Sequence, residues 1–410
     1  MANVSSSNGL EKRPKLRFPG FDEPWKETTL SALFSKSTQK NADGHITNVI
    51  CNSAKLGLIP QREYFDKDIA NSDNTSGYYI IRQNDFVYNP RKSYDAPYGP
   101  IRSYKYAEDG IVSPLYLCFH AKRKINPMYY EWYFRSSAWH RYIYMSGDSG
   151  ARHDRVSIKD DTFFAMPINL PSEREQSKIA SFLQSLDERI AAQEKLVASL
   201  KKYKRGVVRT LLSPKHCKLK NVEWTTAKIG DIGTFIKGAP LSKADISSDG
   251  TPFILYGELY TTYNEVISKV VRKTQASVDK QYYSQIGDVI IPTSGETPEE
   301  ISTASCVMLP DIILAGDLNI YRCTQVDGRI MSYILNHVVN DRIARVAQGK
   351  SIVHIQATEI SKIEITYPDL ISQKKLIETF DAITARIDQG MRELELLQVH
   401  HKALLQQLFI

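Results

Sequence analysis

An internal duplication runs through almost the whole chain of 410 residues, and it constrains the fold more than any single motif does. Trp25 and Trp224 open the two halves, and each is followed by two aliphatic residues at the same spacings. The offset between the halves is 199 residues there, 203 where Asp85-Phe86-Val87 matches Asp288-Val289-Ile290, and 197 from Met166 onward. Each copy carries its own set of candidate core residues, which predicts two similar domains.

The two copies agree closely in their final third and differ in length in their middle. The offset stays at 197 after Met166, whereas the first half carries five extra residues after Gly147-Asp148-Ser149. Packed helices resist changes of length, while surface loops that choose a ligand accept them. We therefore expect the middle of each half to carry out recognition.

Each half ends in a long segment with the four-three spacing of apolar residues that is typical of a coiled-coil seam. Polar or small residues interrupt both seams at the same two places, Gln193 and Lys204 in one and Gly390 and His401 in the other. Because a polar seam residue specifies register, these matching interruptions predict that the helices face each other in an antiparallel coiled coil. The apolar seam residues are Ile179, Leu183, Leu186, Ile190, Val197, Leu200, Leu376, Phe380, Ile383, Ile387, Leu394 and Leu397.

The alternative is that each helix packs only on its own domain. Length argues against it, since about 40 residues that rise about 1.5 Å each make a rod of roughly 60 Å. The expected fold class is α+β, with two tandem-duplicated domains of mixed strands and helices, separated by two long helices that form an antiparallel coiled coil. The expected boundaries are a flexible polar leader at 1–17, a first domain at 18–170, its helix at 171–213, a second domain at 214–368 and its helix at 369–410.

Composition argues against several classes of protein. No apolar run approaches the roughly 20 residues that span a bilayer, and the first residues lack the apolar segment of a secretory signal. We therefore expect a cytoplasmic protein without membrane contact. The cysteines, which form no CxxC pair, are expected to be free thiols rather than disulfides or zinc ligands; they are Cys51, Cys118, Cys217, Cys306 and Cys323.

Catalytic motifs are not found in the sequence. Gly349-Lys350-Ser351 resembles the end of a phosphate-binding loop, but position 344, where that motif needs glycine, is alanine. Asn89-Pro90 lacks the Pro-aromatic pair of an amino-methyltransferase, and no HExxH or GxSxG pattern occurs. We expect a binding protein with no catalytic residues and no metal ligands of its own.

The first candidate binding surface is the stretch at 78–106, where tyrosines alternate with basic residues. Cations beside aromatic and amide groups suit the phosphates and bases of DNA. A solvated strand-and-loop surface with half-buried tyrosines is the alternative. The candidate DNA-binding residues here are Tyr88, Asn89, Arg91, Lys92, Tyr94, Arg102 and Lys105.

The matching stretch of the second half is a Ser/Gly/Thr loop rather than a basic one. Ser294, Glu296 and Thr297 are candidate base contacts, since a carboxylate accepts hydrogen bonds from cytosine; an ordinary polar turn is the alternative.

A glycine-containing segment that leads into a strand supplies further candidates in both halves, because glycine lets a backbone approach closely. Simple turn chemistry is the alternative here. These candidates are Arg152, His153 and Arg155 in the first half and Lys350, Ser351 and His354 in the second, and Lys237 completes the set.

The most specific pieces of the sequence are the openings at Trp25 and Trp224, LPSEREQSKIASFLQSLDERI at 170–190, GDVIIPTSGET at 287–297 and GKSIVHI at 349–355. Together they resemble the specificity (S) subunit of type I restriction-modification enzymes, over nearly the whole chain. The resemblance implies two target recognition domains that each read one half of a split double-stranded DNA sequence, with the helices as spacers. It also implies docking to two methyltransferase (M) subunits and, through them, to restriction (R) subunits. S-adenosylmethionine, ATP and magnesium would then be bound by these partners and no cofactor by this chain.

Charge is divided unevenly along the chain, whose net charge is +7. Residues 171–220 contain 12 basic and 5 acidic residues, whereas 221–367 contain 13 basic and 17 acidic ones. A negative second domain is unhelpful for phosphate binding, so we expect a local basic face or the methyltransferase subunits to supply the attraction. A two-headed coiled-coil adaptor that binds protein partners is the alternative function, which a salt-sensitive, sequence-selective shift of DNA would separate from a DNA reader.

Overall fold

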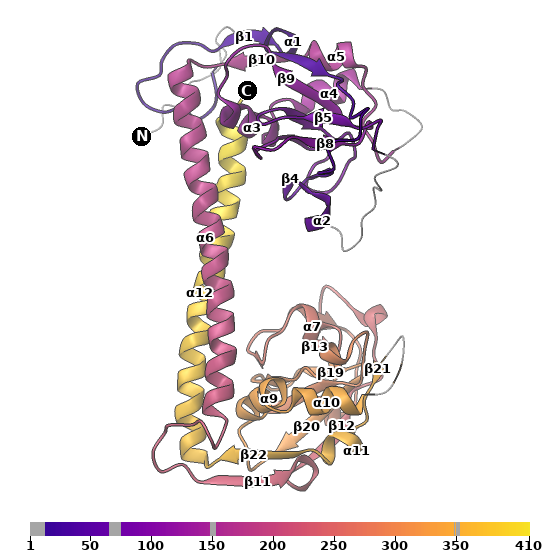
Figure 1. Ribbon diagram of the computed structural model, residues 1–410. Coiled ribbons are helices and arrows are strands. Elements are labelled where there is room, and N and C mark those ends of the chain that lie inside the picture. Colours follow the sequence, from indigo (N-terminus) through magenta and orange to yellow (C-terminus); the bar gives the residue numbers. More distant parts are fainter. Residues whose placement is uncertain (1–12, 65–74, 148–152, 348, 350–352) are drawn as a thin grey trace. The chain divides into compact units, whose positions relative to one another are not determined.

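The chain folds into two compact units, and the computed structural model describes residues 13–64, 75–147, 153–347, 349 and 353–410 (Figure 1). The first unit contains the residues up to Glu194 together with Glu393–Ile410, and the second contains Lys195–Arg392. Each long helix therefore contributes one half to each unit.

The first unit contains short strands and helices that lead into the first long helix. They are β1 (Lys26–Thr29), α1 (Leu30–Leu33), β2 (Phe34–Ser37), β3 (Ile50–Ser53), β4 (Gly57–Pro60), α2 (Gln61–Tyr64), β5 (Tyr79–Ile81), β6 (Phe86–Tyr88), β7 (Ile101–Ser103), β8 (Gly110–Val112), β9 (Leu117–Ala121), α3 (Pro127–Arg135), α4 (His140–Ser146), α5 (Asp160–Phe164), β10 (Pro167–Leu170) and α6 (Glu173–Leu211).

The second unit repeats this order with more strands and ends in the second long helix. Its elements are β11 (Trp224–Lys228), η2 (Ile229–Asp231), β12 (Gly233–Lys237), η3 (Lys243–Asp245), β13 (Thr251–Leu255), α7 (Glu258–Thr261), β14 (Val266–Ile267), β15 (Arg272–Thr274), η4 (Lys280–Tyr282), β16 (Asp288–Pro292), β17 (Ser294–Gly295), α8 (Pro298–Ile301), β18 (Ser305–Val307), β19 (Ile313–Ala315), β20 (Leu318–Cys323), α9 (Gly328–His337), α10 (Asn340–Val346), β21 (Val353–His354), α11 (Ala357–Ser361), β22 (Glu364–Pro368) and α12 (Leu370–Gln407).

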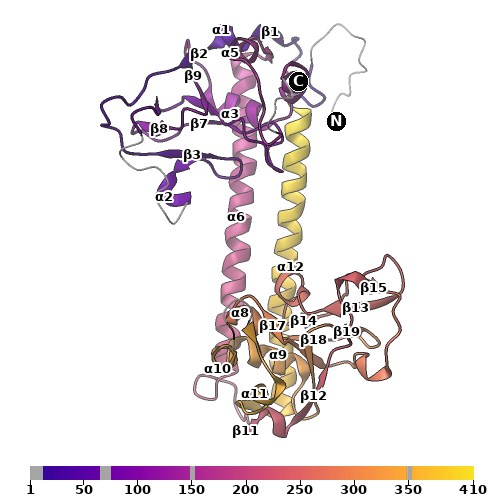
Figure 2. The ribbon, with the colours of Figure 1, turned by 90° about the vertical axis from the view of Figure 1, so that its right-hand side faces the viewer.

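Both units build their central sheet from equivalent strands, which confirms the duplication. The order is β2-β9-β6-β7 in the first unit and β12-β20-β16-β18-β14 in the second, where a three-stranded sheet of β15, β13 and β19 is added (Figure 2). Antiparallel ladders of β1 with β10 and of β11 with β22 join the first strand of each domain to the strand just before its long helix. The domain is thereby anchored where its helix begins.

Helices α6 and α12 pack as an antiparallel pair within each unit, which confirms the predicted coiled coil (Figure 1). In the first unit Asp187 lies 4.0 Å from His401, and Gln398 donates a hydrogen bond to Glu194 at 3.2 Å. In the second unit the last turns of α6 share a core with the first turns of α12. Among the predicted seam residues, Ile179, Leu183, Ile190, Val197, Leu376, Phe380 and Ile387 are buried, and Leu186, Leu200, Ile383, Leu394 and Leu397 are half-buried.

Equivalent glutamines fasten the start of both long helices. Gln176 and Gln373 each donate a side-chain hydrogen bond to the carbonyl of the proline five residues earlier, at 3.1 and 2.7 Å. Asp369 additionally accepts hydrogen bonds from the backbone and hydroxyl of Ser372, which hold the pKa of Asp369 at about 2. The bond from the Ser372 N–H satisfies one of the backbone donors that the start of a helix leaves without a partner.

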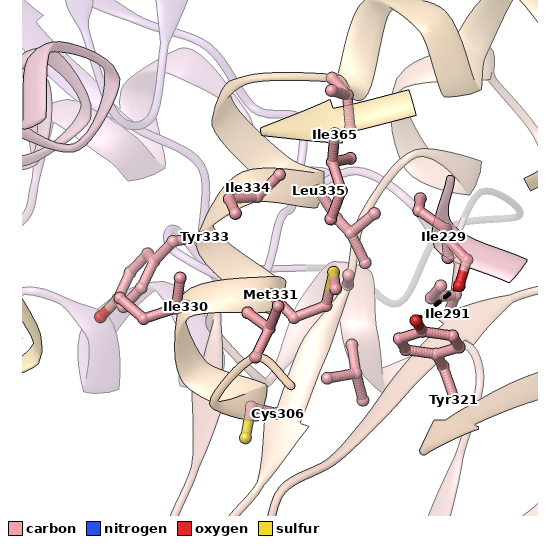
Figure 3. Close-up of a cluster of buried hydrophobic side chains, with 14 of the residues drawn as sticks. Ile229, Ile291, Cys306, Tyr321, Ile330, Met331, Tyr333, Ile334, Leu335 and Ile365 are labelled. Carbon is pink, nitrogen blue, oxygen red and sulfur yellow. Dashed lines mark hydrogen bonds between the residues drawn. The ribbon is translucent and has the colours of Figure 1, made fainter. Parts of the chain in front are cut away.

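The cores of the two units differ in character. Phe34, Phe86 and Phe119 pack with ring centroids 5.3–5.6 Å apart in the first unit. The core of the second unit is mainly aliphatic, and Tyr321 crosses it to donate a hydrogen bond to the carbonyl of Ile229 at 2.7 Å (Figure 3). Trp132 and Tyr133 in the first unit and Ile334 and Leu335 in the second are all buried.

Two short helices follow each other in the middle of each domain, α3 and α4 in the first and α9 and α10 in the second. In the first unit the chain turns at Ser136, whose hydroxyl donates to the carbonyl of Tyr133 at 2.6 Å. The indole of Trp139 donates to the carbonyl of Phe134 at 3.0 Å. These bonds satisfy the last carbonyls of α3, so the helix ends there.

The helices and the cysteines bear on two of the expectations drawn from composition. Among the described residues, no helix is both long and apolar enough to cross a membrane. All five cysteines are free, with Cys118 and Cys306 buried and the other three half-buried.

Candidate nucleic-acid interface

The structure brings together the two candidate segments of the first half, which lie more than fifty residues apart in the sequence. The backbone N–H of Lys92 donates to the carbonyl of Asp154 at 2.8 Å, and that of Val156 donates to the carbonyl of Pro90 at 2.9 Å. We call this the first strand pair, and Arg91 lies opposite Arg155 in it. Two cationic side chains are therefore carried on one short ladder.

The second half builds an equivalent second strand pair from β17 and β21. Ser294 lies opposite His354, and the N–H of Ile355 donates to the carbonyl of Thr293 at 3.0 Å. Thr293 is equivalent to Pro90 at the offset of 203, so the two pairs occupy the same place in their domains. By these hydrogen bonds Val156 of the first pair is the structural equivalent of Ile355 of the second pair.

Several candidates in the first half have exposed side chains. We call residues 89–100, between β6 and β7, the basic loop. Arg91, Lys92 and Tyr94 of the basic loop are exposed, Tyr94 completely. Lys105 and His153 are also exposed, whereas Arg155 is half-buried.

Other candidates in the first half hold the basic loop in place through hydrogen bonds and packing. The amide of Asn89 donates to the carbonyl of Asn52 at 3.2 Å and accepts from the N–H of Arg91 at 3.1 Å. Tyr88 is buried, stacks on Phe163 at 5.1 Å and donates its hydroxyl to the carbonyl of Tyr98 at 2.8 Å. Burial raises the pKa of Tyr88, so the phenol stays a neutral donor. These groups hold the loop rather than face solvent.

Gly99 closes the basic loop and was not singled out from the sequence. Its φ is +80°, and a Cβ at this position would lie 2.1 Å from the carbonyl oxygen of Asn89. Only glycine combines this conformation with so close an approach. The local signal was the Tyr-Gly-Pro sequence of a turn.

Arg102 is turned inward. Its guanidinium donates to the carbonyl of Ala54 at 2.5 Å and lies 3.8 Å from Glu131, whose carboxylate also accepts from the N–H of Ser103 at 2.6 Å. The Arg102 side chain is 14% exposed and that of Glu131 is 8% exposed. The Arg102 charge is therefore largely compensated inside the domain by Glu131.

In the second half, too, some candidate residues support the fold while others are exposed. Ser294 is buried, and its hydroxyl donates to Asp317 at 2.6 Å, while its carbonyl accepts from the hydroxyl of Tyr260 at 2.5 Å. Thr297 caps α8 by accepting from the N–H of Glu300 at 3.2 Å. Tyr260 and Asp317 were not predicted, because they lie far from β17 in the sequence.

Exposed candidates in the second half are Glu296, Thr297, His354 and Lys237, the last at the end of β12. A groove of about 760 Å³ lies nearby, with Asp317 in its wall beside Lys243, Glu258 and Arg272. The first unit has a smaller hollow of about 190 Å³, lined by Tyr88 and Val156 among others. Arg152, Lys350 and Ser351 lie outside the described residues.

His140 links the basic loop to the core and makes the first unit sensitive to pH. Its ring lies 4.8 Å from Tyr98, and burial lowers its pKa from 6.5 to about 4. The folded chain therefore binds this proton less readily than the unfolded chain, so stability is lost as the pH falls from about 6.5 towards 4. We expect His140→Phe to reduce the fall in Tm of the full chain between pH 7.5 and pH 5. The exposed His153→Phe variant should keep the wild-type fall, and equal behaviour of the two variants would contradict the assignment.

The two similar units, which share the two long helices, thus carry equivalent strand pairs with different sets of exposed side chains. The chain matches the type I restriction modification DNA specificity domain family over residues 30–202 and again over residues 221–397. The two matches span more than half of the chain, and the chain belongs to this family.

Two solved structures with TM-scores above 0.5 show the same fold at low sequence identity, and a third structure is similar at a lower TM-score. A chain from a type I R-M system, described in terms of complex assembly and conformational transition, is 14% identical with a TM-score of 0.63, and the match covers 94% of this chain and 97% of that one. The type I restriction-modification S subunit from M. genitalium is 15% identical with a TM-score of 0.54, covering 97% and 99%. The HsdS subunit from Thermoanaerobacter tengcongensis is 15% identical with a TM-score of 0.49, covering 98% and 99%. No curated protein sequence matches the chain.

Proposed function

We propose that this DNA specificity protein reads a bipartite, asymmetric DNA target, with residues 18–170 recognising one half and 214–368 the other. The observation that carries the proposal is the pair of equivalent strand pairs. Both have the same backbone framework, but the first presents Arg91 and Lys92 and the second presents Glu296 and His354. A common framework with different exposed groups suits two different half-sites.

The proposal includes partner subunits. The helix pair sets the spacing between the half-sites and docks two methyltransferase subunits, through which restriction subunits join the complex. S-adenosylmethionine, ATP and magnesium are bound by these partners. Membership of the family and the fold shared with a chain of a type I R-M system support this composition.

Mapping methylated bases in cells that carry this chain with its methyltransferase partner tests the proposal. We expect methylation within a split sequence, and we expect it to disappear when the chain is deleted. A contiguous target, or methylation that persists after deletion, would overturn the proposal. A protein adaptor would give no salt-sensitive, sequence-selective shift of DNA by the assembled complex.

The exposed cations of the basic loop should contribute to DNA affinity through phosphates. Each of Arg91→Ala and Lys92→Ala should weaken binding of the assembled complex and reduce the slope of log affinity against log salt by about 1. Lys124→Ala is a matched control, since Lys124 is exposed on the turn before α3, close to where Asn126 contacts Ser177 of α6. Salt titration of DNA binding measures the slope; an equal change in the control would contradict a specific role for the loop.

A further inference from the structure

The two polar seam positions Lys204 and His401 have a structural role different from the one the sequence indicates. Their matching places in the duplication predict that they specify the register of the helices against each other. In the structure each contacts an aromatic side chain of the globular domain in its own unit. The Lys204 ammonium lies 5.1 Å from the ring centroid of Tyr333, and the His401 ring lies 5.4 Å from that of Trp132.

The aromatic partners are themselves equivalent. Tyr333 lies six residues after Asp327, the N-cap of α9, and Trp132 lies six residues after Asn126, the N-cap of α3. The duplication has therefore kept one contact in both units while changing both of its side chains. A contact kept in this way indicates a geometric requirement at this point.

In the second unit the contact is part of an ion cluster. Glu265 accepts from Lys204 at 2.9 Å and contacts His337 at 2.7 Å. Burial by itself would raise the pKa of Glu265, but His337 and Lys204 outweigh it and hold this pKa at about 2. The same carboxylate charge outweighs burial at Lys204 and raises the lysine pKa. All three groups are thus charged or hydrogen-bonded in one fixed arrangement.

The cluster joins the helix pair to two parts of the recognition domain. His337 is the last residue of α9, and Glu265 immediately precedes β14. The carbonyl of Glu265 accepts from the hydroxyl of Ser332 at 2.7 Å and from the N–H of Cys306 at 2.8 Å. A displacement of the domain along α6 would therefore break several polar contacts at once.

The first unit has a corresponding cluster around His401. Asp187 on α6 lies 4.0 Å from His401 and accepts from Arg135 at 3.3 Å. The guanidinium of Arg135 lies 4.2 Å above the Trp132 ring. Burial lowers the pKa of His401, so its ring packs on Trp132 mainly in the neutral form.

Apolar packing alone permits small sliding and rotation, because it has little directional preference. The buried pair of Lys204 and Glu265 permits one geometry, since a displaced charge loses its partner at high cost. At His401 the directional contact is instead the edge-on packing of its ring on Trp132, beside the pair of Arg135 and Asp187. We propose that Lys204 and His401 are positioning residues that lock each recognition domain onto the helix pair and so fix how its half-site is presented. This inference rests on the proposed reading of a bipartite target.

Lys204→Met tests the inference in the assembled complex, since methionine keeps the apolar stem and removes the charge. We expect discrimination against single-base changes in the half-site read by 214–368 to fall by about tenfold, the effect of one mismatched base pair. The half-site read by 18–170 should be unchanged. Lys201→Met is the matched control, because Lys201 lies on the same helix and is exposed. A folded Lys204→Met complex with wild-type discrimination at both half-sites, or an equal loss at both, would overturn the proposal.

Amide hydrogen exchange of the full chain provides a readout that needs no DNA. We expect Lys204→Met to speed exchange in α9 and not in α3, and Lys201→Met to change neither. Unchanged exchange in α9 would overturn the locking role even if the wild-type target proves bipartite. Conversely, faster exchange in α9 together with a contiguous wild-type target would mean that the lock exists and the proposed function is wrong.

Discussion

Replacing Glu265 by alanine should lower the free energy of unfolding by about 3–5 kcal/mol, the usual cost of removing one partner of a buried ion pair. The side chains of Lys204 and His337, which Glu265 contacts, are 8% and 9% exposed. Alanine would leave the lysine charge buried without its carboxylate. Because the pKa of Glu265 is held at about 2, the stabilising contribution is present above pH 4.5 and is lost as the pH falls from there towards 2.

Urea unfolding of the full chain at pH 7 measures this loss. Glu296→Ala is the control, since Glu296 is exposed, and it should change stability by no more than about 0.5 kcal/mol. The double variant Lys204→Met, Glu265→Leu should recover much of the loss, because both charges are then absent. A loss of less than about 1 kcal/mol in Glu265→Ala would show that the cluster is not a buried ion pair of the usual strength.

The fold was predictable because the duplication and the seam spacing are strong periodic signals. Leu376 and Phe380 were identified from spacing alone, and both are buried. The partner of Lys204 was not predictable, because spacing shows that a seam position is polar and not what lies against it. Glu265 is 61 residues away in the sequence, and only the folded domain brings it to the helix.

The sequence supplied the candidate residues but could not show which of their side chains are exposed. Residue type placed Arg91 and Arg102 together as cations, yet Arg91 is exposed while Arg102 faces Glu131 inside the domain. Residue type could not separate the two, because the groups that hold Arg102, the carbonyl of Ala54 and the carboxylate of Glu131, lie far from it in the sequence. Ser294 was likewise chosen for its hydroxyl, which is bonded to the distant Asp317.

Inserting four residues into α6 between positions 190 and 205 should lengthen the nonspecific spacer of the DNA target and leave both half-sites unchanged. Four residues add about 6 Å to a helix and rotate it about 40° beyond one full turn. At about 3.4 Å per base pair, this length corresponds to about two base pairs of DNA. Methylome mapping of the variant measures the spacer directly.

The antiparallel pairing adds a condition to this prediction. Each unit holds its half of α6 against α12, through Asp187 and His401 in the first and through the shared core in the second. An insertion in α6 alone must therefore displace one set of contacts and lower Tm. When α12 receives a matching insertion between 387 and 402, the two helices again have equal lengths. We expect the paired insertion to lengthen the spacer with the smaller loss of Tm. A spacer unchanged in both variants would contradict a ruler role for the helices, and would leave the spacing to be set by the partner subunits instead.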